Sequence, residues 1–172
     1  MNNLSFHITD ITANSIRANA SEIGLSVEEQ DTRIVIRITD NGLGMDAETA
    51  RRVTNPFYTT RTTRKVGLGL PFLIQNAEQT GGSVTLTSEP GKGTEVRAVF
   101  HSDHIDCPPW GDLPGTVALL ITGNPEINVC FEYRSGETGY SISTNEIKEI
   151  LDGVPLSHPK VMLLIKEMIK EN

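Results

Sequence analysis

The chain has 172 residues, of which 37% are hydrophobic, and this is enough apolar material for one domain with an appendage at roughly 100–200 residues per domain. Its net charge of −7 argues against a nucleic-acid partner, because the neutralisation of phosphates needs clustered Lys and Arg. With only two cysteines, no signal-peptide pattern and no apolar run near the roughly 18 residues of a membrane span, we expect a soluble cytoplasmic protein without a membrane partner or a disulfide framework.

The first forty residues predict a helix followed by two strands. The helix has a narrow stripe of apolar and small residues at helical spacing, formed by Ile8, Ile11, Ser15 and Ala18. Alternation of apolar and polar residues predicts one strand over Ile23–Val27 and another over Arg33–Thr39. The polar run Glu28–Asp31 is expected to form the turn between them.

Residues 40–66 are rich in Gly, Thr and Arg and show little periodicity. They predict a long irregular loop, which is typically functional when it occurs inside a compact domain. Helical spacing returns over residues 67–77, and the glycine pair at 81–82 predicts the end of that helix. Residues 84–100 then alternate on either side of a Pro-Gly turn and predict a hairpin.

The C-terminal part begins at a junction, residues 107–111, whose two prolines cannot continue a regular ladder. We expect Trp110 to cover this junction, the alternative being a platform for a ligand. We expect Cys130 to pack as a small apolar residue. The segment beyond it predicts strands at Thr116–Thr122, Ile127–Tyr133 and Tyr140–Ser143, and helices at Asn145–Leu151 and Pro159–Lys170. The broad apolar face of the last helix either packs on the sheet or recruits a partner protein or a second copy.

Three polar residues on the first helix have the composition of a metal and phosphate site. Asp10, Asn14 and Arg17 are spaced i, i+4, i+7, so an acid, an amide and a cation share one face. The amide oxygen of Asn14 is a suitable hard ligand for Mg²⁺. A nearby acid can orient or deprotonate a water, and an arginine can hold a phosphate oxygen. The alternative is a solvated helix face with incidental polar neighbours.

The segment DNGLGM, residues 40–45, directly follows the second strand. Asp40 shares the parity of the isoleucines in that strand, so its carboxylate is predicted to point into the layer that packs against the helices. A carboxylate aimed inward needs a hydrogen-bonding partner, and the exocyclic amine of an adenine would serve. Gly42 and Gly44 would let the backbone approach a flat ring closely, while the alternative is an ordinary Asp-Asn-Gly turn.

The segment GLGL, residues 67–70, stands at the start of the next predicted helix. Glycines there expose backbone N–H groups, and the helix dipole adds to their attraction for an anion. The preceding loop carries a local excess of Arg and Lys, which would draw a polyphosphate. Phe72 stands where a dinucleotide fingerprint has its third glycine, and GKGT at residues 91–94 lacks the first glycine of a P-loop.

Taken in order, these motifs resemble the ATP-binding domain of the GHKL superfamily, which includes gyrase, heat-shock chaperone, histidine kinase and mismatch-repair ATPases. The similar segments are the N box at residues 10–20, the first glycine box at 40–45, the phenylalanine motif at 55–60, the second glycine box at 67–70 and the closing motifs at 81–82 and 88–94. The resemblance covers residues 5–100 and is to a stand-alone version of the domain.

The resemblance implies a site for ATP and Mg²⁺. It implies that Asn14 coordinates Mg²⁺, that Asp40 accepts the adenine amine and that Arg17 contacts phosphate. It also places Asp10 at the position of the general base, and it implies that Thr94 supports the adenine through hydroxyl and water contacts. The other residues expected to line the nucleotide and its lid are Gly42, Gly44, Met45, Phe57, Gly67, Leu68, Gly69 and Leu70.

The implied fold is α+β, a two-layer α/β sandwich with a mixed sheet and helices on one of its faces. We expect residues 1–103 to form the ATP-binding domain and residues 104–172 to form a small α+β extension of unknown role.

The expected function is that of a Mg-ATP-binding signalling ATPase or protein kinase that acts on a partner protein in trans. Autophosphorylation is not expected, because none of the four histidines has the sequence context of a phosphoacceptor. Two alternatives stay open: a non-catalytic, nucleotide-dependent regulatory module similar to an anti-sigma factor, and the catalytic half of a split sensor histidine kinase. A homodimer also stays open.

Overall fold

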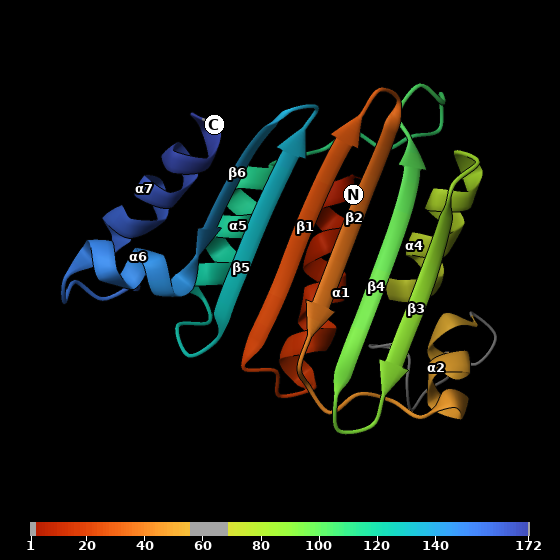
Figure 1. Ribbon diagram of the computed structural model, residues 1–172, viewed down its shortest axis with the longest axis horizontal. Coiled ribbons are helices and arrows are strands. Elements are labelled where there is room, and N and C mark those ends of the chain that lie inside the picture. The colour runs from red at the N-terminus through yellow and green to blue at the C-terminus, as the bar shows by residue number, and fades with distance from the viewer. Residues whose placement is uncertain (1–2, 56–68, 172) are drawn as a thin grey trace.

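The computed structural model describes residues 3–55 and 69–171 as a two-layer α+β sandwich, which confirms the predicted fold class (Figure 1). One layer is a mixed six-stranded sheet in the order β3-β4-β2-β1-β5-β6. Its strands are β1 (Glu22–Gln30), β2 (Arg33–Asp40), β3 (Ser83–Glu89), β4 (Gly93–His101), β5 (Asn128–Ser135) and β6 (Thr138–Ser143). The helices are α1 (Leu4–Arg17), α2 (Ala47–Thr54), α4 (Gly69–Gln79), α5 (Leu113–Thr122), α6 (Thr144–Leu151) and α7 (Pro159–Lys170).

Helices α1, α4 and α5 lie behind the sheet on one face in Figure 1, and the core fills the space between the layers. Neighbouring strands are antiparallel except β1 and β5, which are parallel. Because side chains alternate along a strand, the apolar positions predicted from period two face the helices. Ile23, Leu25 and Val27 of β1 are each at most 1% exposed.

Helix α1 is held at its first turn by the junction that precedes α5. The side chain of Asn3 accepts a hydrogen bond from Phe6 N at 2.7 Å as the N-cap. The backbone N–H groups of Leu4 and Ser5 donate to the carbonyl oxygens of Pro109 and Trp110. The junction therefore satisfies donors that the first turn of a helix leaves free, and it fixes α1 against the C-terminal segment.

The predicted strand at Thr116–Thr122 is wrong, because these residues lie in helix α5. A short apolar run does not distinguish a buried strand from a buried helix. Here two local features favour a helix. The Asp112 carboxylate caps the helix by accepting a hydrogen bond from Gly115 N at 3.0 Å, and Pro114 lies in the first turn. The helix is also buried against both the sheet and α7.

Two other local predictions need correction. The loop expected over residues 40–66 contains helix α2, which is capped by Asp46 and buries only Val53, so it shows no apolar period. The polar run Glu28–Asp31 is not a turn, because β1 continues to Gln30 and Asp31 alone takes a left-handed backbone, with φ of 55°. At this strand end Glu28 and Gln30 are exposed, whereas Glu29 is half-buried on the face that carries Val27.

The C-terminal segment continues the sheet through β5 and β6 and adds α5 to the helical layer. The strands and helices predicted at 127–133, 140–143, 145–151 and 159–170 are confirmed, within a residue or two at their ends. Cys130, however, is exposed rather than packed inward. Helix α7 buries Val161, Ile165 and Ile169 and packs against α5. None of the helices in the described residues is long and apolar enough to cross a membrane.

Candidate functional site

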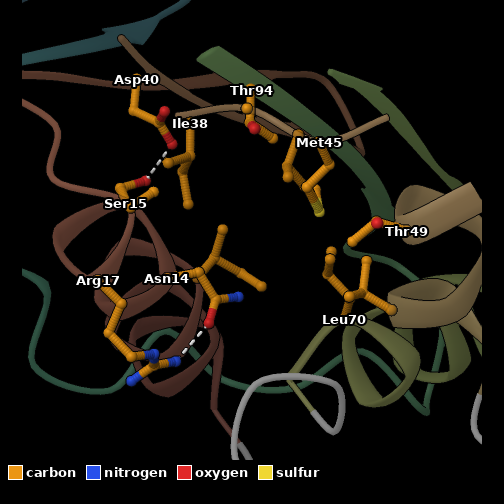
Figure 2. Close-up of a pocket in the computed structure, with 14 residues that line it drawn as sticks. Asn14, Ser15, Arg17, Ile38, Asp40, Met45, Thr49, Leu70 and Thr94 are labelled. Atoms are coloured by element: carbon orange, nitrogen blue, oxygen red, sulfur yellow. Dashed lines mark hydrogen bonds between the residues drawn. The ribbon is translucent and has the colours of Figure 1, made fainter. Parts of the chain in front are cut away.

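A cavity of about 310 Å³ opens between the end of α1 and the adjoining ends of β2 and β4 (Figure 2). Its wall combines a few polar groups with a mostly apolar surface. Of the residues predicted to form the site, those that line it are Asn14, Arg17, Asp40, Gly44, Met45, Leu70 and Thr94. The sequence motifs, which are separated along the chain, therefore meet at one place in the fold.

Asp40 ends β2, and its carboxylate points toward the helices as its parity predicts (Figure 2). Its Oδ2 accepts a hydrogen bond from Ser15 Oγ at 2.6 Å, and its Oδ1 accepts one from Gly42 N at 2.9 Å. These two donors fix the orientation of the carboxylate. Because each carboxylate oxygen has two lone pairs, Asp40 keeps acceptor capacity toward the cavity.

Two glycines hold the loop after β2 close to its neighbours. A Cβ added to Gly42 would lie 2.7 Å from the carbonyl oxygen of Ala18, at the C-cap of α1. Gly44 has a φ of 72°, and a Cβ there would lie 2.0 Å from the carbonyl oxygen of Glu89. Both positions require glycine. Gly42 does not line the cavity, but its close contact with Ala18 brings the end of α1 next to Asp40.

Thr94 stands beside Asp40 in the β2–β4 register, and its hydroxyl is positioned by Ser88. Ser88 Oγ lies 2.8 Å from Thr94 Oγ1 and also accepts a hydrogen bond from Met45 N at 2.8 Å. The Ser88 hydroxyl thus ties the start of β4 to the loop that carries Met45. Asp40 and Thr94 together present two oxygen groups at the same end of the cavity.

Asn14 and Arg17 lie at the opposite rim, on the last turns of α1 (Figure 2). The guanidinium of Arg17 donates a hydrogen bond to Asn14 Oδ1. An amide oxygen and an exposed cation are therefore adjacent at the mouth of the cavity. This pair offers a neutral oxygen ligand for a hard metal ion and a positive charge for an anion.

The rest of the wall is apolar and comes from both layers. Ile38 and Val96 contribute from the sheet, Ile11 from α1, Val53 from α2 and Leu70 from α4. These five side chains form a surface that suits a flat, poorly hydrated ring. A mostly apolar pocket with a few fixed polar groups is the usual form of a small-molecule site.

Asp10 is not part of the cavity wall. It lines a neighbouring hollow on the surface of α4, with Phe6 and Phe72, and does not line the cavity that holds Asn14. Partial burial raises the pKa of its carboxyl group, while the charge of Arg17 acts in the opposite direction. Gly69, also absent from the cavity wall, packs against Asp10, since a Cβ on Gly69 would lie 3.5 Å from the Asp10 Cβ. Phe57, Gly67 and Leu68 lie outside the described residues.

Several residues in or next to the cavity are not predicted by the sequence motifs. Ser15 was assigned to the apolar stripe of α1, although a serine in that stripe is a signal for a polar partner on the sheet, here Asp40. Thr49 and Val53 belong to a helix whose polar composition conceals it. Ser88 lies next to the cavity and is not predicted individually, because its hydrogen bonds to Met45 and Thr94 depend on the fold.

Comparison with known proteins gives a family match over the motif-bearing part of the chain. Residues 3–104 match the family described as histidine kinase-, DNA gyrase B-, and HSP90-like ATPase. The chain is 29% identical over 104 residues to sensor histidine kinase YxdK of Bacillus subtilis, which is 56% of this chain and 32% of that protein. It is 30% identical over 101 residues to sporulation kinase C of the same organism, and this match covers 58% of this chain and 23% of that protein. The matched part is thus a third or less of the length of these kinases.

A solved structure described as the N-terminal domain of a DNA repair protein has a similar fold. The TM-score is 0.62 at 16% sequence identity, and the match covers 86% of this chain and 56% of the other. At this identity the match shows the fold alone. Since 86% of the chain is more than residues 3–104 span, the likeness in fold extends into the C-terminal segment.

Proposed function

We propose, from the premise that this chain belongs to the family of histidine kinase-, DNA gyrase B- and HSP90-like ATPases, that its cavity binds ATP with Mg²⁺ and that the bound nucleotide controls or phosphorylates a partner protein. The observation that carries the proposal is the Asp40 carboxylate, fixed by Ser15 and Gly42 at the inner end of an apolar cavity. An acceptor held in one orientation, beside a surface for a flat ring, suits the amine edge of an adenine.

The opposite rim supports binding of the phosphates. Arg17 places a cation beside the cavity mouth, and an arginine can hold phosphate oxygens through charge-assisted hydrogen bonds. Helix α4 begins at Gly69 and contributes Leu70 to the wall, so the positive end of its dipole lies at this side of the cavity. Adenine and phosphate contacts would therefore lie at different ends of the same cavity.

The residues present also fit Mg²⁺. Asn14 lines the cavity, and its side-chain oxygen accepts one hydrogen bond, from Arg17. An amide oxygen has two lone pairs, so a second lone pair is left for a metal ion. One amide ligand suffices for an ion that keeps most of its waters and takes its other ligands from phosphates. When bound, the ion would supply positive charge that stabilises the phosphates.

Isothermal titration with ATP and Mg²⁺ tests the binding proposal. Wild-type protein is expected to bind, and Asp40→Asn is expected to weaken binding roughly tenfold to hundredfold, because a hydrogen bond to a charged group contributes about 1.5–3 kcal/mol. Asp31→Asn is the matched control, since Asp31 lies in the β1–β2 turn at the other end of the strands and its φ of 55° suits Asn. Absence of binding by wild type, or equal binding by Asp40→Asn, would refute the proposal.

A second function, nucleotide binding without turnover, is favoured by the place of Asp10. The proposed general base lines a hollow other than the cavity, and a base must lie within reach of the proton that it removes. Phosphate release distinguishes the two functions. Release that is lost in both Asn14→Ala and Asp10→Asn supports an ATPase, whereas ATP binding with no release above background supports a regulatory module.

The proposed partner supplies the phosphoacceptor if the protein is a kinase. All four histidines lie in the described residues, and none lines the cavity. Labelled ATP offered with candidate partners tests this step. Label on a histidine of a second protein supports transfer in trans, and label on this chain alone would contradict it.

A further inference from the structure

A second cavity, of about 270 Å³, lies on the helical face of the sheet far from the first. Asp40 pairs with Ile23 near the start of β1, whereas the second cavity contains Glu29 near the end of the same strand. Six residues of strand separate the two positions, which is about 20 Å at ~3.3 Å per residue. No sequence motif marks this second cavity, and the proposed nucleotide function does not use it.

Aromatic residues and one carboxylate dominate the lining of this cavity, which comprises Trp110, Phe131, Tyr133, Tyr140 and Glu29 together with apolar groups of α5 and α7. The aromatic residues and Glu29 come from β1, β5, β6 and the junction before α5. All of them lie in the described part of the chain. The cavity is therefore formed where the C-terminal segment packs onto β1.

The carboxylate of Glu29 is oriented by two neutral donors. Trp110 Nε1 donates to Glu29 Oε1 at 2.5 Å, and the Tyr133 hydroxyl donates to Glu29 Oε2. Burial, together with the hydrogen bond to Glu29, raises the pKa of Tyr133 to about 12. The phenol therefore remains a neutral donor at physiological pH, and neither donor compensates the negative charge.

Within the described residues, no ion pair involves Glu29. A half-buried carboxylate among aromatic rings is costly unless a cation is near it. Glu29 therefore lacks a countercharge in the described part of the chain. In the same cavity, the buried hydroxyl oxygen of Tyr140 has no hydrogen-bond partner among the described residues. Both groups are in place for a ligand that carries a positive charge.

We propose that this aromatic cavity binds a small organic ammonium cation, which pairs with Glu29 among the rings of Trp110, Tyr133 and Tyr140. Aromatic rings attract cations through their quadrupole, and cages of this composition suit alkylated ammonium groups. A metal ion is disfavoured because it needs several oxygen, nitrogen or sulfur ligands, and the described residues contain no cluster of three His, Cys, Asp or Glu. The volume of about 270 Å³ is slightly below the ~300–1,000 Å³ of typical ligand pockets and suits a small ligand.

Fluorescence titration tests the proposal directly, because Trp110 is the single tryptophan of the chain. The probes are choline and n-butylammonium, with 3,3-dimethyl-1-butanol as the uncharged isostere of choline, all in the absence of ATP. At least one of the two cations is expected to change the Trp110 fluorescence in a saturable way. Its affinity should be at least tenfold higher than that of the alcohol. Tighter binding of choline indicates a quaternary ammonium ligand, and tighter binding of n-butylammonium indicates a primary ammonium ligand.

Glu29→Gln separates the charge from the shape of the cavity. The single side-chain oxygen of Gln can accept from Trp110, and its NH₂ group can donate to the hydroxyl oxygen of Tyr133. The substitution removes the negative charge, so affinity for the cation should fall at least tenfold. Glu28→Gln is the matched control, because Glu28 is the exposed neighbour on the other face of β1. Thermal unfolding of each variant checks the fold. The proposal is overturned if neither cation gives a saturable change, if the alcohol binds equally well, or if folded Glu29→Gln binds like wild type.

Discussion

The cavity around Asp40 and the cavity around Glu29 lie on the same face of one sheet and share a plan, with one carboxylate oriented by two donors. They differ in the source of those donors. Asp40 is held by groups 2 and 25 residues away in the sequence, whereas Glu29 is held by side chains 81 and 104 residues away. The first site depends on tight backbone contacts of a local loop, and the second depends on how the C-terminal segment docks.

Helix α1 connects the two regions. Its first turn is bound by the carbonyl groups of Pro109 and Trp110, and its last turns carry Asn14 and Ser15 to the Asp40 cavity. A perturbation at the middle of α1 is therefore expected to affect both cavities. One at either end should affect one cavity and leave the other unchanged.

The largest effect is expected from Gly44→Ala, which should disrupt the Asp40 cavity. Its Cβ would lie 2.0 Å from the carbonyl oxygen of Glu89 at a φ of 72°, so the clash adds to the backbone strain, and we expect a loss of at least ~3 kcal/mol of unfolding free energy. Gly91→Ala is the control, because its φ of 78° is similar and no atom lies within 4 Å of the added Cβ. Urea denaturation measures the loss of unfolding free energy in both variants. Equal losses would show that the backbone strain, and not the clash with Glu89, accounts for the effect.

The next effect is acid destabilisation through His7, which should weaken both cavities together. His7 is 2% exposed on α1, and burial lowers its pKa from 6.5 to about 4. The unfolded chain therefore binds more protons between these values, so stability is retained above pH 6.5 and falls as the pH drops, by about 3 kcal/mol at pH 4. Urea denaturation at several pH values between 4 and 6.5 gives the unfolding free energy as a function of pH. This free energy should fall less steeply with decreasing pH in His7→Gln than in the wild type. An unchanged slope would exclude His7 as the cause.

A smaller effect should separate the two ends of α1. Ser15→Ala removes a donor to Asp40 and should weaken ATP binding about tenfold, since one hydrogen bond to a charged group contributes roughly 1.5 kcal/mol. Ser5→Ala is the matched control, because Ser5 is also buried on α1 but donates to the Trp110 carbonyl oxygen at 2.5 Å. Calorimetric titration of both variants is the measurement. Equal weakening by both would mean that the ends of α1 are not independent.

The smallest effect concerns the Glu29 cavity. Tyr133→Phe removes a donor to Glu29 and should cost about 1 kcal/mol of unfolding free energy without changing ATP affinity. Tyr140→Phe removes a buried hydroxyl with no partner in the described residues, so it should be neutral or stabilising. Denaturant unfolding followed by Trp110 fluorescence compares the two. A larger loss in Tyr140→Phe would show that its hydroxyl has a partner in solution.

Strong periodicity and clustered motifs made much of the fold predictable. Alternating residues gave the strands around Ile23–Val27 and Ile34–Ile38, and the parity of Asp40 correctly placed its side chain on the helical face. Predictions failed where the pattern was ambiguous or weak. The apolar run of α5 satisfies either a helix or a strand, and α2 has a single buried residue, Val53, to reveal it.

The sequence by itself determined the order of the motifs and the face on which Asp40, Asn14 and Arg17 lie, because those relations depend on the fixed periods of strands and helices. Only the tertiary structure decided that Asp10 lies outside the cavity and that Ser15 lies within it. It also decided that Glu29, Trp110 and Tyr133 meet. Such contacts join segments far apart in the chain, and strand pairing and helix docking set their geometry, which no local pattern encodes.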